Sequence, residues 1–395
     1  MEGGTEGEIQ VEQTERATRR MTHAESRTVL RILDANANRA GEGLRTLEEF
    51  ARFILDDHNL TDCLKTHRHD LAIAMGRWNR LQLIESRDTP GDVGTGVTTA
   101  SEQSRADLSE VVAAATTRTQ QALRCLEEYG KTTDPEFAAS IESIRYQCYA
   151  TFRDLELKVA SVNDRSRKIR EARLYALIAC EPDAERLEAR IDELVDAGVD
   201  VIQLRDSSVD DRTLYQQATL GAVIAKRHDI LWMINDRADI AVAAGADGVH
   251  VGQEEVPVDA VRRVVGRGRL IGLSTHDIEQ VREAARTTAD YIGCGPTFPG
   301  KTKSFDHFPG CEFLKQVSEE ERTGDHNLPA FAIGGIGLEN IEKVAQSGIG
   351  RVAVTGALAS HEGLHQTALG IREILERVPL RMTPDSGDVC SHPDG

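Results

Sequence analysis

The C-terminal half of the chain alternates short apolar runs with amphipathic segments. From Leu174 onward the apolar runs are short and uninterrupted, which is typical of parallel strands buried on both faces. The segments between them, such as ERLEARIDELVDAG, carry apolar residues at helical spacing. This alternation over residues 174–378 predicts an α/β fold, a (β/α)8 TIM barrel. The eight predicted strands are YALIAC, VDVIQLR, ILWMIND, GVHVG, LIGLSTH, YIGCGP, AFAIGG and RVAVTGA.

A helical pattern precedes the barrel. From Thr28, apolar residues recur at three- and four-residue steps, as in an amphipathic helix. The segment GLRTLEEF at 43–50 reappears as ALRCLEEY at 122–129. Each copy is followed by a helical segment with a similarly placed arginine, Arg68 or Arg145. We therefore expect an all-α domain built on a duplicated helical hairpin.

The change of pattern sets the expected domain bounds. A chain of 395 residues is too long for one ordinary hydrophobic core, so two domains are expected. Both ends are polar and poor in apolar residues, as in disordered tails. The predicted order is a tail over 1–26, an all-α domain over 27–154, a charged linker helix over 155–173, the barrel over 174–378 and a tail over 379–395.

Charge and composition narrow the expected partners and location. A net charge of −18 argues against a general binder of nucleic acid or of membrane surfaces. No apolar run approaches the roughly 20 residues that cross a membrane, and the polar N-terminus is unlike a signal peptide. Seven scattered cysteines without a Cys-x-x-Cys pair suit reduced thiols. We expect a cytoplasmic protein with no nucleic acid or membrane partner.

Polar side chains follow most of the predicted strands, where a barrel carries its chemistry. Each residue alone could equally cap a helix. Together, Asp236 and Glu255 offer the carboxylates that Mg²⁺ accepts beside substrate oxygens, and Arg205 can bind two diphosphate oxygens at once. Lys303 lies in a long loop of the kind that closes over substrates. The strand ends therefore predict a magnesium and diphosphate site from Gln203, Arg205, Asn235, Asp236, Glu255, Ser274, His276, Thr302 and Lys303.

Two glycine-rich turns follow the last two predicted strands. Gly334, Gly335 and Gly337 are expected to leave backbone N–H groups uncovered at the start of a helix, LENIEKVAQSG. A second turn of this kind is expected at Thr355–Gly356. One such turn would be explained by tight chain reversal alone. Two after strands seven and eight of a barrel favour a phosphate site.

Six ordered motifs give the C-terminal half a family resemblance. QLRD, INDR, ADGVHVGQEE, IGLSTH, GPTFPGKTK and AIGGI resemble thiamine-phosphate synthase over nearly all of 174–378. That family joins hydroxymethylpyrimidine diphosphate to thiazole phosphate with Mg²⁺ and releases diphosphate. The pyrimidine diphosphate ionises to a carbocation, which the thiazole nitrogen attacks.

The resemblance also implies residue roles. Asp236 and Glu255 would hold Mg²⁺, and Ser274 would lie beside the reacting pyrimidine. Arg205, Ser274 and Lys303 would be the catalytic residues. The diphosphate would be held by Gln203, Arg205, Asn235 and Lys303, and the thiazole phosphate by Thr302, Gly335, Thr355 and Gly356.

The chain departs from the family pattern at four positions. Ser207 stands where the family has Lys, and Glu255 where it has Asp. Gly300 replaces a hydroxyl donor and Gly356 a common Ser. Losing one charge-assisted contact costs about 1.5–3 kcal/mol, so the enzyme would be slow unless Lys301 substitutes. Two alternatives stay open here: a thiazole tautomerase of the same barrel, and a non-catalytic protein that binds thiamine precursors.

The N-terminal half resembles a second family through LDANANRAGEGLRTLEEFARF and DTPGDVGT. These segments are similar to a helical domain fused to some thiamine-phosphate synthases and associated with a hydroxymethylpyrimidine phosphate kinase. The resemblance implies ATP binding and synthesis of the diphosphate that the barrel consumes. The alternative is a structural, dimerising domain, which would make the protein a homo-oligomer. The candidate kinase residues are Asn36, Arg39, Glu42, Arg45 and the loop 91–95.

Overall fold

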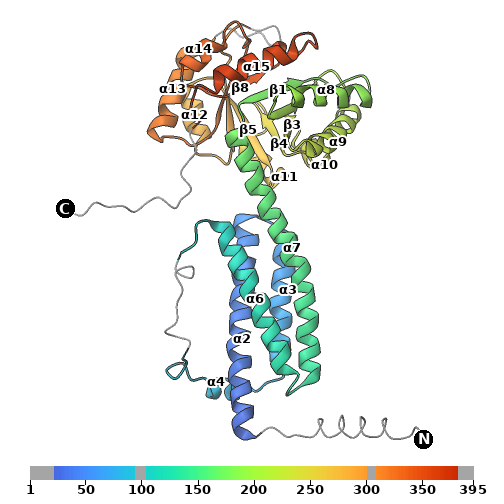
Figure 1. Cartoon of the computed structure of the whole chain (residues 1–395), viewed down its shortest axis with the longest axis vertical. Helices are drawn as coiled ribbons and strands as arrows, with labels where there is room; N and C mark the ends of the chain where they lie inside the picture. Colours follow the sequence, from blue (N-terminus) through green and yellow to red (C-terminus); the bar gives the residue numbers. More distant parts are fainter. Residues whose placement is uncertain (1–21, 94–103, 300–307, 381–395) are drawn as a thin grey trace, which may run out of the picture. The chain divides into compact units, whose positions relative to one another are not determined.

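The computed structural model describes residues 22–93, 104–299 and 308–380 (Figure 1). The chain divides into two compact units, with the boundary between Leu157 and Lys158. The first is helical in its described part, and the second contains a closed barrel of eight strands. The predicted fold class is confirmed. No helix of the described residues is long and apolar enough to cross a membrane.

The first unit is built on helices that run side by side (Figure 1). Gly43 of α2 lets α6 approach closely, because a Cβ there would lie 2.1 Å from Oγ1 of Thr119. The described elements of this unit are α2 (His23–Glu49), the π-helical turn η1 (Phe50–Ile54), α3 (His58–Met75), α4 (Arg80–Ser86), α6 (Leu108–Gly130) and the first part of α7 (Pro135–Glu171).

Helix α2 begins earlier than the apolar pattern predicts. The Thr22 hydroxyl accepts a hydrogen bond from the Glu25 backbone at 3.2 Å. In return, the Glu25 carboxylate accepts one from the Thr22 backbone at 2.8 Å, which completes a capping box. Residues 23–26, predicted to belong to the tail, are therefore helical. Their polar first turn carries no apolar period by which the sequence could reveal them.

The predicted linker helix is the C-terminal part of α7, which continues without a break from Pro135 to Glu171. Its last turns belong to the second unit. Ile169 and the following Ala172 are buried with apolar residues from the first positions of the barrel strands. Arg165 donates to the Asp247 carboxylate at 2.7 Å and to the Gly268 carbonyl at 2.9 Å. This end of α7 therefore closes the N-terminal mouth of the barrel.

The barrel forms as the apolar runs predict. All strand pairs are parallel, each strand pairs with the next along the chain, and β8 closes onto β1. The strands are β1 (Leu174–Ile178), β2 (Val201–Leu204), β3 (Leu231–Asn235), β4 (Gly248–Val251), β5 (Leu270–Thr275), β6 (Tyr291–Cys294), β7 (Ala330–Ile333) and β8 (Val352–Val354).

Alternate strand residues build two cores, because successive side chains point to opposite faces of a sheet. One face packs against the surrounding helices, and the other fills the barrel. Inside, the Phe331 ring meets both Tyr175 and Tyr291 edge-on, with each pair of ring centroids 5.6 Å apart. The surrounding elements are α8 (Ala184–Asp196), α9 (Asp211–Arg227), α10 (Ala238–Ala243), α11 (Val258–Val265), α12 (Ile278–Ala284), α13 (Gly310–Thr323), α14 (Ile341–Gln346), η2 (Gly356–Leu358) and α15 (Leu364–Leu375).

Candidate functional site

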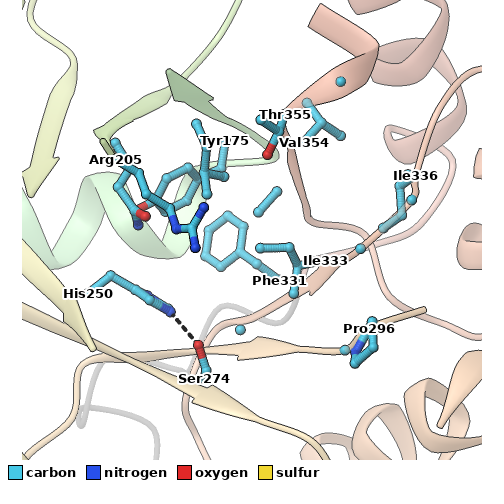
Figure 2. A pocket seen from close by; sticks show the side chains of 18 of the residues that line it. Tyr175, Arg205, His250, Ser274, Pro296, Phe331, Ile333, Ile336, Val354 and Thr355 are labelled. Carbon is cyan, nitrogen blue, oxygen red and sulfur yellow. Dashed lines mark hydrogen bonds between the residues drawn. The ribbon is translucent and has the colours of Figure 1, made fainter. Parts of the chain in front are cut away.

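A cavity of about 1000 Å³ opens at the C-terminal ends of the barrel strands. Its floor is the aromatic layer of the barrel interior, and its walls are the loops that follow the strands (Figure 2). Thr302 and Lys303 fall outside the described residues. The other predicted barrel residues all line this one cavity: Gln203, Arg205, Asn235, Asp236, Glu255, Ser274, His276, Gly335, Thr355 and Gly356.

Arg205 is a positive charge placed at the cavity (Figure 2). It follows β2 directly, and its backbone N–H donates to the Ile178 carbonyl at 2.8 Å. Its guanidinium is exposed, and no hydrogen bond or ion pair joins that group to a residue that the structure describes. Burial, together with the charge of Arg205, lowers the pKa of His250 to about 4. His250 is therefore neutral at neutral pH, and Arg205 is available to a ligand anion.

Oxygen donors lie on the wall after β3 and β4. Asp236 adopts φ 58°, in the left-handed region, where its backbone N–H donates to the His250 carbonyl at 2.8 Å. The Asn235 amide donates to the Asp236 carboxylate at 2.6 Å. Glu255 is exposed on the loop after β4. Among the described residues, no group of three or more His, Cys, Asp or Glu is placed to hold a metal ion, whereas Mg²⁺ needs only one or two carboxylates beside water and substrate oxygens. Asp236 and Glu255 fit that requirement.

The two glycine turns line the cavity, with one difference from the prediction. Gly335 has φ 61°, and a Cβ there would lie 2.6 Å from the carbonyl oxygens of Phe298 and Pro299. Only glycine fits this turn without displacing the neighbouring loop. Helix α14 starts later than predicted, at Ile341, and the Gly337 N–H donates to the Asn340 side chain at 3.0 Å. The expectation that Gly337 offers an uncovered N–H group is therefore wrong.

Sequence reasoning missed a line of hydrogen bonds across the barrel interior. It joins Gln203 to Ser274 through the buried side chains of Tyr175, Tyr291 and His250. Figure 2 shows its last step, from His250 to Ser274. The available signal was a histidine inside the otherwise apolar run GVHV, at an inward-facing position.

The candidate residues of the helical unit separate in space. Glu42 and Arg45 line an open groove between α2 and α3, together with Arg68. Asn36 is buried, and its amide donates to the Ile32 carbonyl of its own helix at 2.9 Å. Arg39 is exposed outside the lining of that groove. Of the loop 91–95, the last two residues lie outside the described part of the chain.

The two repeats use the same ion pair. In the first, the Arg68 guanidinium donates to the buried Glu48 carboxylate at 2.8 Å. In the second, Arg145 donates to the buried Glu127 carboxylate at 2.7 Å. Each pair ties a LEE segment to the helix that follows it in the repeat. The glutamates at these two equivalent positions are thus structural clamps between helices.

Both halves of the chain match models of known protein families. Residues 174–358 match the family described as thiamine monophosphate synthase, and residues 31–154 match the ThiD2 family. A thiamine-phosphate synthase of Rhodopirellula baltica is 82% identical over 95% of this chain and 100% of that protein.

A more distant relative carries the same name. A thiamine-phosphate synthase of Thermosynechococcus vestitus is 36% identical over 90% of this chain and 96% of that protein. A solved thiamine phosphate pyrophosphorylase from Pyrococcus furiosus is 28% identical, with a TM-score of 0.46 over 53% of this chain and 98% of that one. The identity to the relatives along nearly the whole chain decides the matter: the protein belongs to the thiamine-phosphate synthase family, a family of transferases.

Proposed function

We propose that the barrel joins hydroxymethylpyrimidine diphosphate to the nitrogen of a thiazole phosphate and releases diphosphate. The observation that carries this proposal is one cavity that combines Arg205, Asp236 and Glu255 with the polar groups of Gln203 and Ser274. These groups can bind the anionic diphosphate, a divalent cation and the polar pyrimidine ring. The direct test is diphosphate release that requires both precursors.

The reaction needs stabilisation of a departing anion more than it needs proton transfer. The bond between the pyrimidine methylene carbon and the diphosphate oxygen breaks, and the thiazole nitrogen forms the new bond with its own electron pair. Arg205 binds the departing diphosphate as negative charge develops on it. Gln203 binds the diphosphate beside Arg205, Ser274 orients the pyrimidine, and Thr355 and the Gly335 turn bind the thiazole phosphate. No protein base is required.

Magnesium fits the same site. Asp236 and Glu255 would hold Mg²⁺, with Asn235 fixing the orientation of the Asp236 carboxylate through its hydrogen bond. When bound, the ion supplies Lewis-acid stabilisation of the leaving diphosphate oxygens. The family resemblance adds Lys303 to the diphosphate and Thr302 to the thiazole phosphate. A cytoplasmic location agrees with the free thiols of the six cysteines that the structure describes.

The substitution Ser207→Lys tests the effect of restoring the lysine that the family has at this position. Ser207 is exposed just after β2, two residues beyond Arg205, so a longer side chain meets no packing obstacle there. We expect about a three- to tenfold lower KM for the pyrimidine diphosphate, because an added charge-assisted contact is worth about 1 kcal/mol on an exposed loop. Ser208→Lys, one position further, is the matched control. Equal kinetics for wild type and Ser207→Lys would mean that the diphosphate is already neutralised elsewhere, with Lys301 the first residue to test.

We further propose that the helical unit phosphorylates hydroxymethylpyrimidine phosphate with ATP. The match to the ThiD2 family supports this, together with the groove that carries Glu42, Arg45 and Arg68. A kinase needs cations for phosphate and a carboxylate for Mg²⁺, and this groove offers both. The product of that reaction is the substrate of the barrel.

The internal repeat supplies a matched test of the kinase proposal. Arg45 lines the groove and pairs with Glu48 at 3.2 Å. Arg124 occupies the same place in the second repeat and makes the equivalent pair with Glu127 at 2.9 Å, but it does not line the groove. Arg45→Ala in the full chain is expected to reduce the ATP-dependent formation of hydroxymethylpyrimidine diphosphate at least tenfold. Arg124→Ala should leave it within about twofold, since Arg124 is half-exposed and Lys131 and Arg145 still pair with Glu127. Equal loss in both variants would assign the effect to helix packing instead.

A further inference from the structure

Five side chains form a continuous hydrogen-bonded line through the barrel interior. The Gln203 amide donates to the Tyr175 hydroxyl at 2.7 Å, and the two tyrosine hydroxyls lie 3.0 Å apart. The Tyr291 hydroxyl lies 3.1 Å from Nδ1 of His250. Nε2 of the same ring lies 3.0 Å from the Ser274 hydroxyl. The line begins and ends on residues that face the cavity.

The number of donor hydrogens on these side chains fixes the direction of hydrogen-bond donation along the line. Burial raises the pKa of both tyrosine hydroxyls, so each keeps its single proton. Because the amide N–H₂ of Gln203 can only donate, Tyr175 accepts from it and passes its own proton toward Tyr291. Tyr291 then donates to Nδ1 of His250, which must be the bare nitrogen. Nε2 carries the ring proton and donates it to Ser274.

A glycine in a barrel strand leaves space for this line of hydrogen bonds. Gly272 lies in the middle of β5, where a Cβ would sit 2.3 Å from Nδ1 of His250 and 2.4 Å from the Tyr291 hydroxyl. Glycine weakens a strand interior, and its usual reason there is the close approach of another group. At this position the group is the hydrogen-bonded pair of Tyr291 and His250.

We propose that Tyr291 and His250 are positioning residues that fix the direction of the Ser274 hydroxyl. Because Ser274 accepts from His250, its own proton is left to donate into the cavity. Ser274 is thereby presented as a hydrogen-bond donor to an acceptor atom of the substrate, with no rotation needed at the moment of reaction. This inference deepens the proposed synthase function and rests on it for its kinetic consequence.

The first test reads the histidine directly and needs no activity. In the ¹⁵N-labelled full chain, imidazole ¹H–¹⁵N correlation spectra distinguish a protonated ring nitrogen from a bare one, and His250→Asn identifies the His250 signals. We expect Nε2 to be protonated and Nδ1 to be bare and hydrogen-bonded. In Tyr291→Phe the Nδ1 signal should shift toward that of a nitrogen without a hydrogen bond. A proton on Nδ1 in the wild type would overturn the proposal.

The second test separates positioning from packing. Tyr291→Phe keeps the ring and removes only the hydroxyl, and we expect kcat to fall about tenfold with the KM for the thiazole phosphate unchanged. The matched control is Thr275→Val, which removes a buried hydroxyl from the same strand as Ser274. The Thr275 hydroxyl donates to the Gly293 carbonyl, and Thr275 itself does not line the cavity. Equal kcat in the two variants would overturn the positioning role. If wild type releases no diphosphate, the synthase proposal fails, while the histidine spectrum still decides the direction of the line.

Discussion

Replacing Asp236 by Asn is expected to lower Mg²⁺-dependent diphosphate release at least about a hundredfold while the barrel stays folded. The substitution removes the charge that would hold the cation but keeps the shape of the side chain. Asp236 adopts φ 58°, which Asn tolerates better than most residues. The free energy of unfolding should therefore change by less than about 1 kcal/mol. The measurement is initial rate against Mg²⁺ concentration, beside a chemical denaturation curve.

The control for Asp236→Asn lies three residues further along the chain. Asp239 is exposed and bound to Arg237 at 2.7 Å, and it does not line the cavity. Asp239→Asn should leave the magnesium dependence unchanged. If Asp236→Asn turns over normally at limiting Mg²⁺, Asp236 is not a magnesium ligand.

Arg205→Ala is expected to lower kcat/KM by about a hundredfold to a thousandfold, with most of the loss in kcat. The charge of Arg205 stabilises the diphosphate more as it departs than while it is bound to carbon, so its removal raises the barrier. With Ser in place of the family lysine at 207, fewer cations remain to compensate. Single-turnover rates with saturating precursors provide the measurement.

The fold of Arg205→Ala should be unaffected, because the side chain is exposed and none of the described residues pairs with it. Arg212→Ala, on the exposed start of α9, is the matched loss of a surface cation. Arg205→Lys should recover part of the rate, since a single ammonium keeps the charge but not the paired geometry. A raised KM with normal kcat in Arg205→Ala would show that Arg205 binds the substrate and the transition state equally strongly, which contradicts the proposed role.

The barrel and the wall of its cavity could be predicted from sequence because both follow local rules. Apolar runs such as AFAI mark doubly buried strands, and the closure of the barrel brings their C-terminal ends together. Polar residues at those ends, Arg205, Asp236 and Ser274 among them, had to meet in one cavity. The residue roles themselves stay predictions, which the substitutions above address.

The features that the sequence did not predict depend on contacts between distant segments. Tyr175, His250 and Tyr291 come from β1, β4 and β6, and only the closed barrel brings their side chains together. His250 lies in the motif ADGVHVGQEE, but that motif does not reveal the two tyrosines. The Gly337 N–H is taken by Asn340, a local contact that the glycine pattern does not encode. In the helical unit, the sequence predicts that Asn36 and Glu42 belong to one site because both are polar. Asn36 is instead buried and bonded to its own helix.

The central claim is that the full chain is a magnesium-dependent synthase that forms thiamine phosphate. The measurement is diphosphate release by the purified full chain, given hydroxymethylpyrimidine diphosphate and thiazole phosphate, with and without Mg²⁺. We predict release that requires both precursors and the cation, in equal amount to the thiamine phosphate formed, and its loss in Asp236→Asn. Binding of both precursors without release of diphosphate, or isomerisation of the thiazole without metal, would contradict the account.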